Sequence, residues 1–124
     1  GGIDMAVIYD NKVKGMGDCV AEFEDSGMFI LFGDNAPDTL KDYCYSIDVN
    51  PIQEEIKAGQ KAVIDGKEYT ITAVGNVVMK NLGNLGHVTF SFTGETEAEL
   101  PGTIYLEEAK VPKLDIGSTI QIVA

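Results

Sequence analysis

The chain contains no arginine and no tryptophan, and among its 124 residues it has only one histidine and two cysteines. Its 9 lysines are outnumbered by 20 aspartates and glutamates, which gives a formal net charge of −11. This charge argues against binding to nucleic-acid phosphates, which requires clustered lysines and arginines, and against binding to anionic membrane surfaces. We therefore expect no nucleic-acid partner and no attachment to an anionic membrane.

Long apolar stretches are also missing. No run approaches the roughly 20 residues that a membrane-spanning helix needs, and no charged and then apolar leader opens the chain. We therefore expect no direct membrane insertion and, because no export signal is visible, a cytoplasmic location. Residues 1–4, ahead of Met5, are interpreted as a leader added for expression. The remaining residues, 5–124, are predicted to form a single domain, as the hydrophobic fraction of 44% and the length suggest.

The two cysteines, Cys19 and Cys44, lie 25 positions apart and neither has a second cysteine nearby. An intracellular protein usually keeps such thiols reduced, and isolated cysteines are often buried as small apolar residues. We predict two free, structural thiols, although one disulfide between them is the alternative.

Glycine is plentiful, with 14 residues, and it divides the sequence into short segments. No amphipathic stretch longer than about ten residues has helical periodicity, which excludes a helical bundle. Many short strands separated by turn residues are typical of a small β-barrel or sandwich. The prediction is an all-β fold, a small closed or nearly closed β-barrel with one or two short helices. The expected strands cover residues 5–9, 28–32, 43–47, 61–64, 67–74, 77–79, 88–92, 103–106 and 119–123.

Two local patterns are clearer than the rest. Asp65-Gly66 lies between two alternating segments and can adopt the positive φ values of a type I′ hairpin turn. The polar residues before Pro37 are a helix-start signal and predict a short helix over residues 37–42. Residues 80–86 are expected to be either a short helix or a glycine-rich loop.

His87 is the strongest candidate for chemistry because imidazole is the side chain that titrates near neutral pH. As a nucleophile or proton carrier it would use one ring nitrogen while a hydrogen bond to the other fixes the tautomer. The alternative is a structural histidine at the start of a strand, hydrogen-bonded to the backbone.

Residues 81–86, just before His87, could present several backbone N–H groups in one concavity that holds an anion. They match neither of the common phosphate-loop motifs, so an ordinary tight connection that uses glycine for positive φ is the other interpretation. Arginine is absent, and a phosphoryl group would therefore have to be held by backbone amides, by a lysine or by groups of a partner.

Glu95, Glu97 and Glu99 alternate, which on a strand would place three carboxylates on one face. We interpret them as a solvated acidic edge, since charged side chains protect exposed strands, and we predict no metal site and no other cofactor. No serine or cysteine lies in a nucleophile-elbow sequence, so nothing supports a hydrolase.

Several short motifs occur in a specific order along the chain, and the stretch from residue 72 to 103 is the most specific. Through them the sequence resembles the glucitol/sorbitol-specific IIA component of the bacterial phosphoenolpyruvate-dependent sugar phosphotransferase system, from Met5 onward. The motifs are Val-Ile-Tyr at 7–9, Gly-x-x-Ala-Pro at 33–37, Tyr-Cys at 43–44, Thr-Ala-Val-Gly at 72–75, Asn-Leu at 81–82, Leu-Gly-His-Val-Thr at 85–89, Glu-Ala-Glu at 97–99 and Pro-Gly-Thr at 101–103.

The resemblance implies a small closed β-barrel that relays a phosphoryl group. A histidine takes the group from the phosphorylated carrier HPr and passes it to the IIB domain of a glucitol (hexitol) permease. In the family, the phosphorylated histidine is assigned just after a Phe/Tyr-Cys pair, but the matching residues here, 45–48, include none. We predict that His87 is the carrier, because it is the only imidazole in the chain. The alternative is a binding or regulatory module of the same fold that is not phosphorylated.

In the predicted mechanism, neutral His87 attacks the phosphoryl group on the histidine of HPr by in-line displacement. The backbone amides of Gly83, Asn84 and Gly86 would hold the phosphoryl oxygens, and Lys80 would supply a cation. Both assignments rest on proximity in the sequence.

Overall fold

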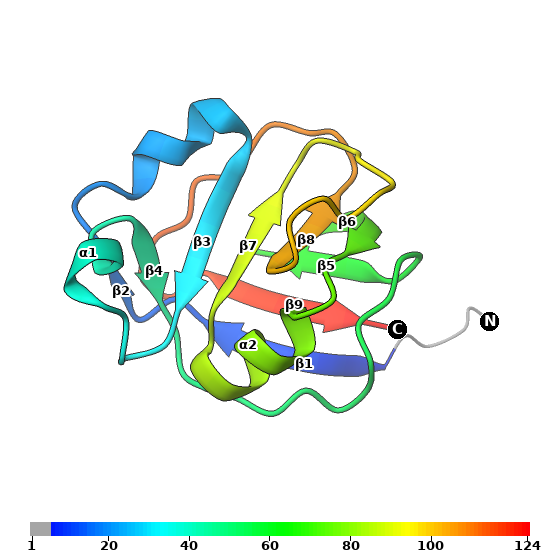
Figure 1. The fold of residues 1–124 in the computed structure, drawn as a ribbon, viewed down its shortest axis with the longest axis horizontal. Helices are drawn as coiled ribbons and strands as arrows, with labels where there is room; N and C mark the ends of the chain where they lie inside the picture. Colours follow the sequence, from blue (N-terminus) through cyan, green and yellow to red (C-terminus); the bar gives the residue numbers. More distant parts are fainter. Residues whose placement is uncertain (1–5) are drawn as a thin grey trace.

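The computed structural model describes residues 6–124; the predicted leader at residues 1–4, and Met5 with it, lie outside the described residues. The described part is mostly strands, joined by turns and three short helical segments (Figure 1). In chain order the elements are β1 (Val7–Lys12), β2 (Gly15–Met16), the 3-10 helix η1 (Val20–Ser26), β3 (Met28–Phe32), α1 (Asp38–Lys41), β4 (Cys44–Ser46), β5 (Lys61–Ile64), β6 (Lys67–Val74), α2 (Val78–Leu85), β7 (Val88–Ser91), β8 (Thr103–Leu106) and β9 (Thr119–Val123).

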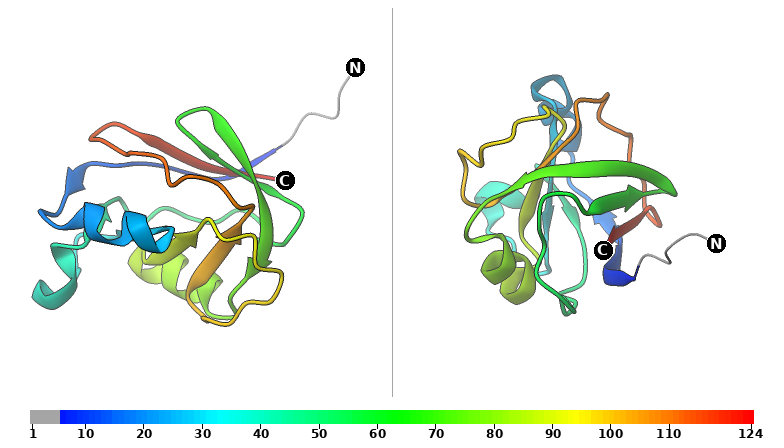
Figure 2. Two further views of the ribbon diagram at one scale, coloured as in Figure 1. Left: turned by 90° about the horizontal axis from the view of Figure 1, so that it is seen from above. Right: turned by 90° about the vertical axis from the view of Figure 1, so that its right-hand side faces the viewer.

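All of these strands belong to one curled sheet, in the order β1-β9-β5-β6-β8-β7-β3-β4-β2. The long strand β6 is shared by two layers: its first half pairs with β5 and its second half with β8. The register with β8 shifts between Ile71 and Ala73, and such an irregularity lets a strand bend from one layer into the other. In the left view of Figure 2, the red β9 and the dark-blue β1 run above the layer that carries the yellow-green α2.

The two ends of this sheet, β1 and β2, are linked by only two residues, Val13 and Lys14. The N–H of Val13 donates to the carbonyl of Ser118 in the first layer, and the N–H of Lys14 donates to the carbonyl of Ser46 in the second. The chain itself therefore bridges the gap between the layers. The prediction of an all-β, nearly closed barrel with short helices is confirmed.

Aromatic side chains fill the space between the layers. The ring centroid of Phe29 on β3 lies 5.2 Å from that of Phe90 and 5.8 Å from that of Phe92, and Phe92 contacts Tyr69 edge to face at 5.0 Å. All four side chains are buried. They pack β3, β6 and β7 against one another. His87 directly precedes β7 and contacts β3, so this packing fixes the strands around it.

Most of the predicted elements are confirmed. The hairpin β5–β6 turns at Asp65 and Gly66, which both have positive φ (49° and 83°). The helix predicted over residues 37–42 is α1, and residues 80–86 turn out to be helical over most of their length. Cys19 and Cys44 are both free thiols, as predicted. Among the described residues, none of the helices is long and apolar enough to cross a membrane.

Two details differ from the predictions. Residues 77–79, expected as a strand, contain the start of α2, because Val78 and Leu82 are one helical turn apart and are both buried. The short elements β2 and η1 were not predicted at all. The acidic residues 95–99 are exposed and form a loop.

Candidate functional site

His87 lies at the junction between α2 and β7. Gly86 ends the helix in the left-handed conformation, with φ of 68°, and its N–H donates to the carbonyl of Leu82 at 3.0 Å. A Cβ at position 86 would lie 3.0 Å from the backbone nitrogen of Gly33. Glycine therefore allows both the reversal of the chain and the close approach of the neighbouring segment. The turn leaves His87 half-buried at the start of β7.

One ring nitrogen of His87 is held by the backbone of β3. Leu31 is paired with Val88, and its carbonyl oxygen lies 3.1 Å from Nδ1 of His87. A carbonyl can only accept a hydrogen bond, so Nδ1 carries a proton and the lone pair of the neutral ring is on Nε2. Among residues 6–124, no hydrogen bond to Nε2 is formed and no buried side-chain nitrogen or oxygen lacks a partner. Nε2 is therefore open to solvent.

The face of the imidazole is covered by Phe32, the last residue of β3. The two rings are stacked, with centroids 4.2 Å apart and planes inclined by 22°. The Phe32 side chain is itself buried, so it does not rotate freely. Together with the Leu31 carbonyl, this contact fixes both the position and the orientation of the His87 ring.

The segment where the resemblance places the phosphorylated histidine, residues 45–48, lies on the other side of Phe32. β4 runs parallel to β3 with Ser46 opposite Phe32, and the N–H of Ile47 donates to the carbonyl of Phe32 at 3.0 Å. The Ile47 side chain also reaches to within 3.5 Å of a Cβ built on Gly86. The two stretches of sequence considered for the phosphoryl carrier are therefore neighbours on one surface.

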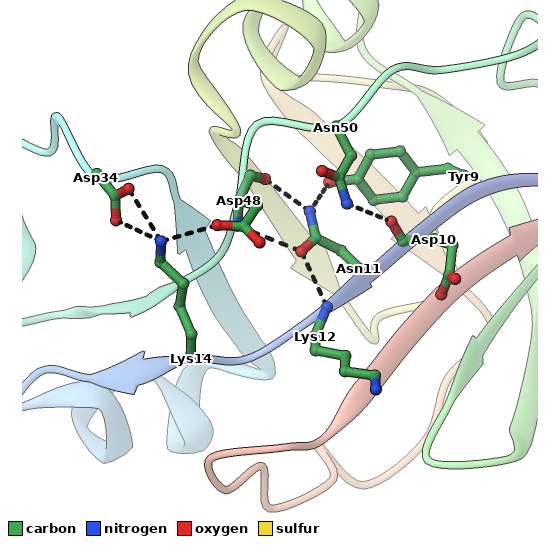
Figure 3. A network of polar contacts seen from close by, with 8 residues as sticks. All are labelled: Tyr9, Asp10, Asn11, Lys12, Lys14, Asp34, Asp48 and Asn50. Carbon is green, nitrogen blue, oxygen red and sulfur yellow. Dashed lines mark hydrogen bonds and ion pairs between the residues drawn. The ribbon is translucent and has the colours of Figure 1, made fainter.

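An ion-pair cluster ties together the two loops beside this surface (Figure 3). The ammonium group of Lys14 lies 2.9 Å from the carboxylate of Asp34 and 2.8 Å from that of Asp48. Hydrogen bonds to Asp48 and then to Asp34 raise the pKa of Lys14 above its ordinary value. Lys14 thus connects the residue after Gly33 to the residue after Ile47.

Asn11 provides a second, buried connection to the same loop (Figure 3). Its amide nitrogen donates to the hydroxyl of Tyr9 at 2.8 Å and to the carbonyl of Asp48 at 2.7 Å. Its amide oxygen accepts hydrogen bonds from the backbone N–H groups of Lys12 and Asp48. Burial raises the pKa of Tyr9, although the hydrogen bond with Asn11 partly opposes that shift. Asn11 therefore fixes the backbone that leads out of β4.

The residues predicted to support a phosphate are all on or beside α2. Lys80 and Asn84 are exposed and one turn apart, so their side chains share one helix face. Gly83 and Asn84 lie within the helix, where backbone N–H groups donate to carbonyls four residues earlier, and the N–H of Gly86 is bonded to Leu82. These amides are thus already engaged, and the groups of this set that face solvent are the side chains of Lys80 and Asn84.

Four residues around His87 and the loop after β4 could not be predicted from the sequence: Asn11, Lys14, Leu31 and Phe32. Each of them reaches the site through a strand pairing or a contact with a distant segment. The one hint in the local sequence is that Phe32 directly precedes the motif at residues 33–37.

The chain as a whole is similar to known proteins of one family. The family model for the PTS system glucitol/sorbitol-specific IIA component matches residues 8–121. The chain belongs to this family. It is 34% identical over 102 residues to the PTS system glucitol/sorbitol-specific EIIA components of Shigella flexneri and Escherichia coli K12, covering 82% of this chain and 83% of each relative. The crystal structure of a PTS system IIA component from Enterococcus faecalis V583 is similar over 94% of this chain and 100% of its own, with 27% identity and a TM-score of 0.80.

As a member of the IIA family, the protein is a component of a sugar phosphotransferase system that carries a phosphoryl group. It works with other proteins of that system. The matched region includes His87, the residues that hold its ring and the segment at residues 45–48.

Proposed function

We propose that His87 is the phosphoryl carrier of this IIA protein and that it is phosphorylated on Nε2. The observation that carries the proposal is the contact between Nδ1 and the carbonyl of Leu31, at 3.1 Å. Because the carbonyl accepts a hydrogen bond, the contact keeps the proton of the neutral ring on Nδ1 and leaves the lone pair of Nε2 facing outward. A nucleophile held in one tautomer and one orientation needs little reorganisation when the phosphoryl donor arrives.

The phosphoryl group moves from one histidine to the other without any proton transfer. The donor is a histidine of HPr that carries the phosphoryl group on one ring nitrogen and a proton on the other. Nε2 of His87 attacks phosphorus in line as the phosphorus–nitrogen bond of the donor breaks, and the donor ring leaves as neutral imidazole. His87 becomes a phosphorylated imidazolium whose Nδ1–H still donates to Leu31. The stacked ring of Phe32 stabilises the new positive charge through a cation–π contact.

The oxygens of the phosphoryl group are stabilised in this proposal by side chains of α2. Lys80 supplies an ammonium group and Asn84 an amide, both from the exposed face of the helix. Lys80 lies five residues before Leu85, the last residue of α2, which is a rise of about 7.5 Å along the helix axis. Gly83 presents no side chain beside these groups, whereas Gly86 is buried against the backbone of Gly33 and serves to turn the chain into His87.

Docking would use the apolar residues around His87. Val49 and Leu85 are 49% and 43% exposed. Both lie beside Gly33: a Cβ built there would be 2.9 Å from Cγ2 of Val49 and 2.6 Å from the Leu85 carbonyl. We assign this small patch to phosphorylated HPr and then to the IIB domain of a hexitol permease. Because each partner must leave after transfer, a small interface is appropriate. HPr and the IIB domain act at the cytoplasmic side, so we place the protein in the cytoplasm.

The test is the intact mass of the protein after incubation with phosphoenolpyruvate, enzyme I and HPr. We expect one acid-labile phosphoryl group on the natural protein and none on His87→Ala, with matching circular dichroism spectra. The matched control is Asn84→Ala, which should slow the transfer but still gain the group. A phosphoryl group that persists in His87→Ala would overturn the assignment to His87.

A second candidate function has one observation in its favour, the absence of histidine at residues 45–48. In that case the protein binds its partners without being phosphorylated. No mass gain in the natural protein, while the Escherichia coli relative gains one in the same reaction, would support this function.

A further inference from the structure

A cavity of about 320 Å³ at one end of the barrel is lined by three of the nine lysines. It lies where the start of β6 meets the loop between β8 and β9. The full lining is Lys67, Tyr69, Lys110, Val111, Pro112 and Lys113. The protein as a whole has a large excess of negative charge, whereas every charged residue that lines this cavity is a lysine.

The three lysines are not neutralised by the protein itself. Within residues 6–124, the ion pairs involve Lys14, Lys41 and Lys57, and none includes Lys67, Lys110 or Lys113. The ammonium group of Lys67 instead lies over the ring of Tyr69, 5.3 Å from its centroid. A cation–π contact holds the charge in place without cancelling it.

The floor of the cavity is apolar. Tyr69 and Val111 are buried members of the core, and Pro112 completes the wall. The cavity thus combines a partly aromatic floor with three lysine side chains, of which Lys67 is held over Tyr69. This combination suits a small molecule that has a multiply charged anionic end and an apolar end.

We propose that this cavity binds a small phosphomonoester whose carbon skeleton rests on Tyr69 and Pro112. A phosphomonoester is close to a dianion at neutral pH. Lysine binds phosphate as a point charge, so three lysines supply the neutralisation that an arginine-free protein cannot obtain from guanidinium groups.

The site is separate from the phosphoryl-transfer surface. His87 precedes β7, whereas Phe92, which packs on Tyr69, follows the same strand. Four strand residues and their flanks span on the order of 15 Å, so a ligand in the cavity does not touch His87. The inference therefore goes beyond the proposed function and does not depend on it.

The test is a titration of the isotope-labelled natural protein with phenyl phosphate, followed by ¹H–¹⁵N NMR at pH 7.5. We expect saturable shifts at residues 67–69, 110, 111 and 113, with the His87 region unchanged. Inorganic phosphate, which lacks the apolar part, should bind several-fold more weakly. Equal affinity for the two probes, or shifts centred on α2 and His87, would overturn the proposal.

A pair of charge-matched variants separates a site from general attraction. The triple variant Lys67→Gln, Lys110→Gln and Lys113→Gln should bind phenyl phosphate about tenfold more weakly, because the charge-assisted contacts are lost. The comparison is a triple variant at exposed lysines elsewhere, which loses the same three charges and should bind like the natural protein. Equal weakening in both would show a diffuse electrostatic effect and refute the cavity as a site. The comparison variant carries Lys12→Gln, Lys41→Gln and Lys57→Gln.

Discussion

At the scale of single residues, a backbone carbonyl decides which nitrogen of His87 is available for chemistry. The Leu31 carbonyl fixes a proton on Nδ1, and Phe32 fixes the plane of the ring. Neither group is itself reactive. Lys14 and Asn11, which lie further from the ring, act in a similar way. Both bind Asp48 and so hold the loop after β4 in place beside the ring.

The buried amide of Asn11 leads to a prediction about stability. In Asn11→Ala, the hydroxyl of Tyr9 and the carbonyl of Asp48 lose their donor, and an unsatisfied buried polar group costs about 1–3 kcal/mol. Urea unfolding should show a decrease of that size in the free energy of unfolding. Asn50→Ala is the control: its amide makes one exposed hydrogen bond, to the carbonyl of Asp10, and the change should stay within about 0.5 kcal/mol. Equal losses in the two variants would contradict the role of Asn11.

The buried thiol of Cys44 leads to a prediction about reactivity. Burial raises the pKa of Cys44 to about 11. The thiolate is the reactive form, so at pH 8 only about one thiol in a thousand is reactive, against about a quarter of the thiols of a free cysteine. Raising the pH increases the thiolate fraction, and alkylation of Cys44 should accelerate steeply up to about pH 11.

Mass spectrometry after iodoacetamide treatment measures this protection directly. In Cys19→Ala, the remaining Cys44 should be modified at least about a hundredfold more slowly in the native protein at pH 8 than in guanidinium. Cys44→Ala reports on the half-exposed Cys19 under the same conditions. Rapid labelling of Cys44 in the folded protein at pH 8 would show that the thiol is not buried.

At this scale the candidate for the reactive group was visible in the sequence, but its surroundings were not. His87 stands out because it is the only imidazole, and its glycine-rich context is visible locally. Leu31 lies 56 positions from His87, and only the pairing of β3 with β7 brings them together. The amide cradle expected from residues 81–86 depended on a loop, whereas the helix engages those amides.

At the scale of elements, two glycines of α2 and its C-terminal cap differ in what they contribute to the position of the site. Gly83 lies inside the helix, and a Cβ there would only touch Cδ1 of Ile52 at an ordinary 3.8 Å. Gly86 ends the helix with positive φ and has the backbone of Gly33 against it. One glycine is replaceable, and the other is required by the geometry.

This difference predicts opposite effects of the same substitution. Gly83→Ala should raise the free energy of unfolding by about 0.5–1 kcal/mol, because alanine favours a helix interior. Gly86→Ala should lower it by about 1–2 kcal/mol, the cost of the left-handed conformation for a residue with a Cβ. Urea unfolding of both variants provides the measurement. The rate of phosphorylation should fall in Gly86→Ala, since the turn orients His87, and stay near the natural value in Gly83→Ala. Two stabilised variants would disprove the requirement at position 86.

Prediction of the elements succeeded where the signal was local. The hairpin β5–β6 has strict alternation and an Asp-Gly turn, and β8 and β9 have the predicted bounds. Prediction failed where the run of apolar residues was too short to distinguish a strand from a helix. The apolar residues 77–79 are compatible with a strand, and only the burial of Val78 and Leu82 on one face decides for a helix. β2 has two residues, too few for any periodicity.

At the scale of the whole molecule, the net charge of −11 should govern how fast partners meet this protein. Attraction of a partner with a basic docking face accelerates association, and salt screens it over a Debye length of about 10 Å at 0.1 M. The second-order rate of phosphoryl transfer from phosphorylated HPr should therefore fall by about three- to tenfold between 20 and 500 mM salt. Rapid-quench measurements give this rate, and thermal unfolding at both salt concentrations controls for stability. A rate that is independent of salt would contradict electrostatic steering.

The position of β9 has a consequence for the order in which the protein can fold. β9 lies between β1 and β5, so the first strand of the chain has no partner strand in its layer until residues 119–123 have been synthesised. The hairpin β5–β6 and the segment around β7 can form early, because their contacts are close in sequence. The layer that contains β1 must wait for the C-terminal strand to leave the ribosome. Pairings so distant in sequence are entropically expensive to close, and refolding in milliseconds to seconds follows from this topology.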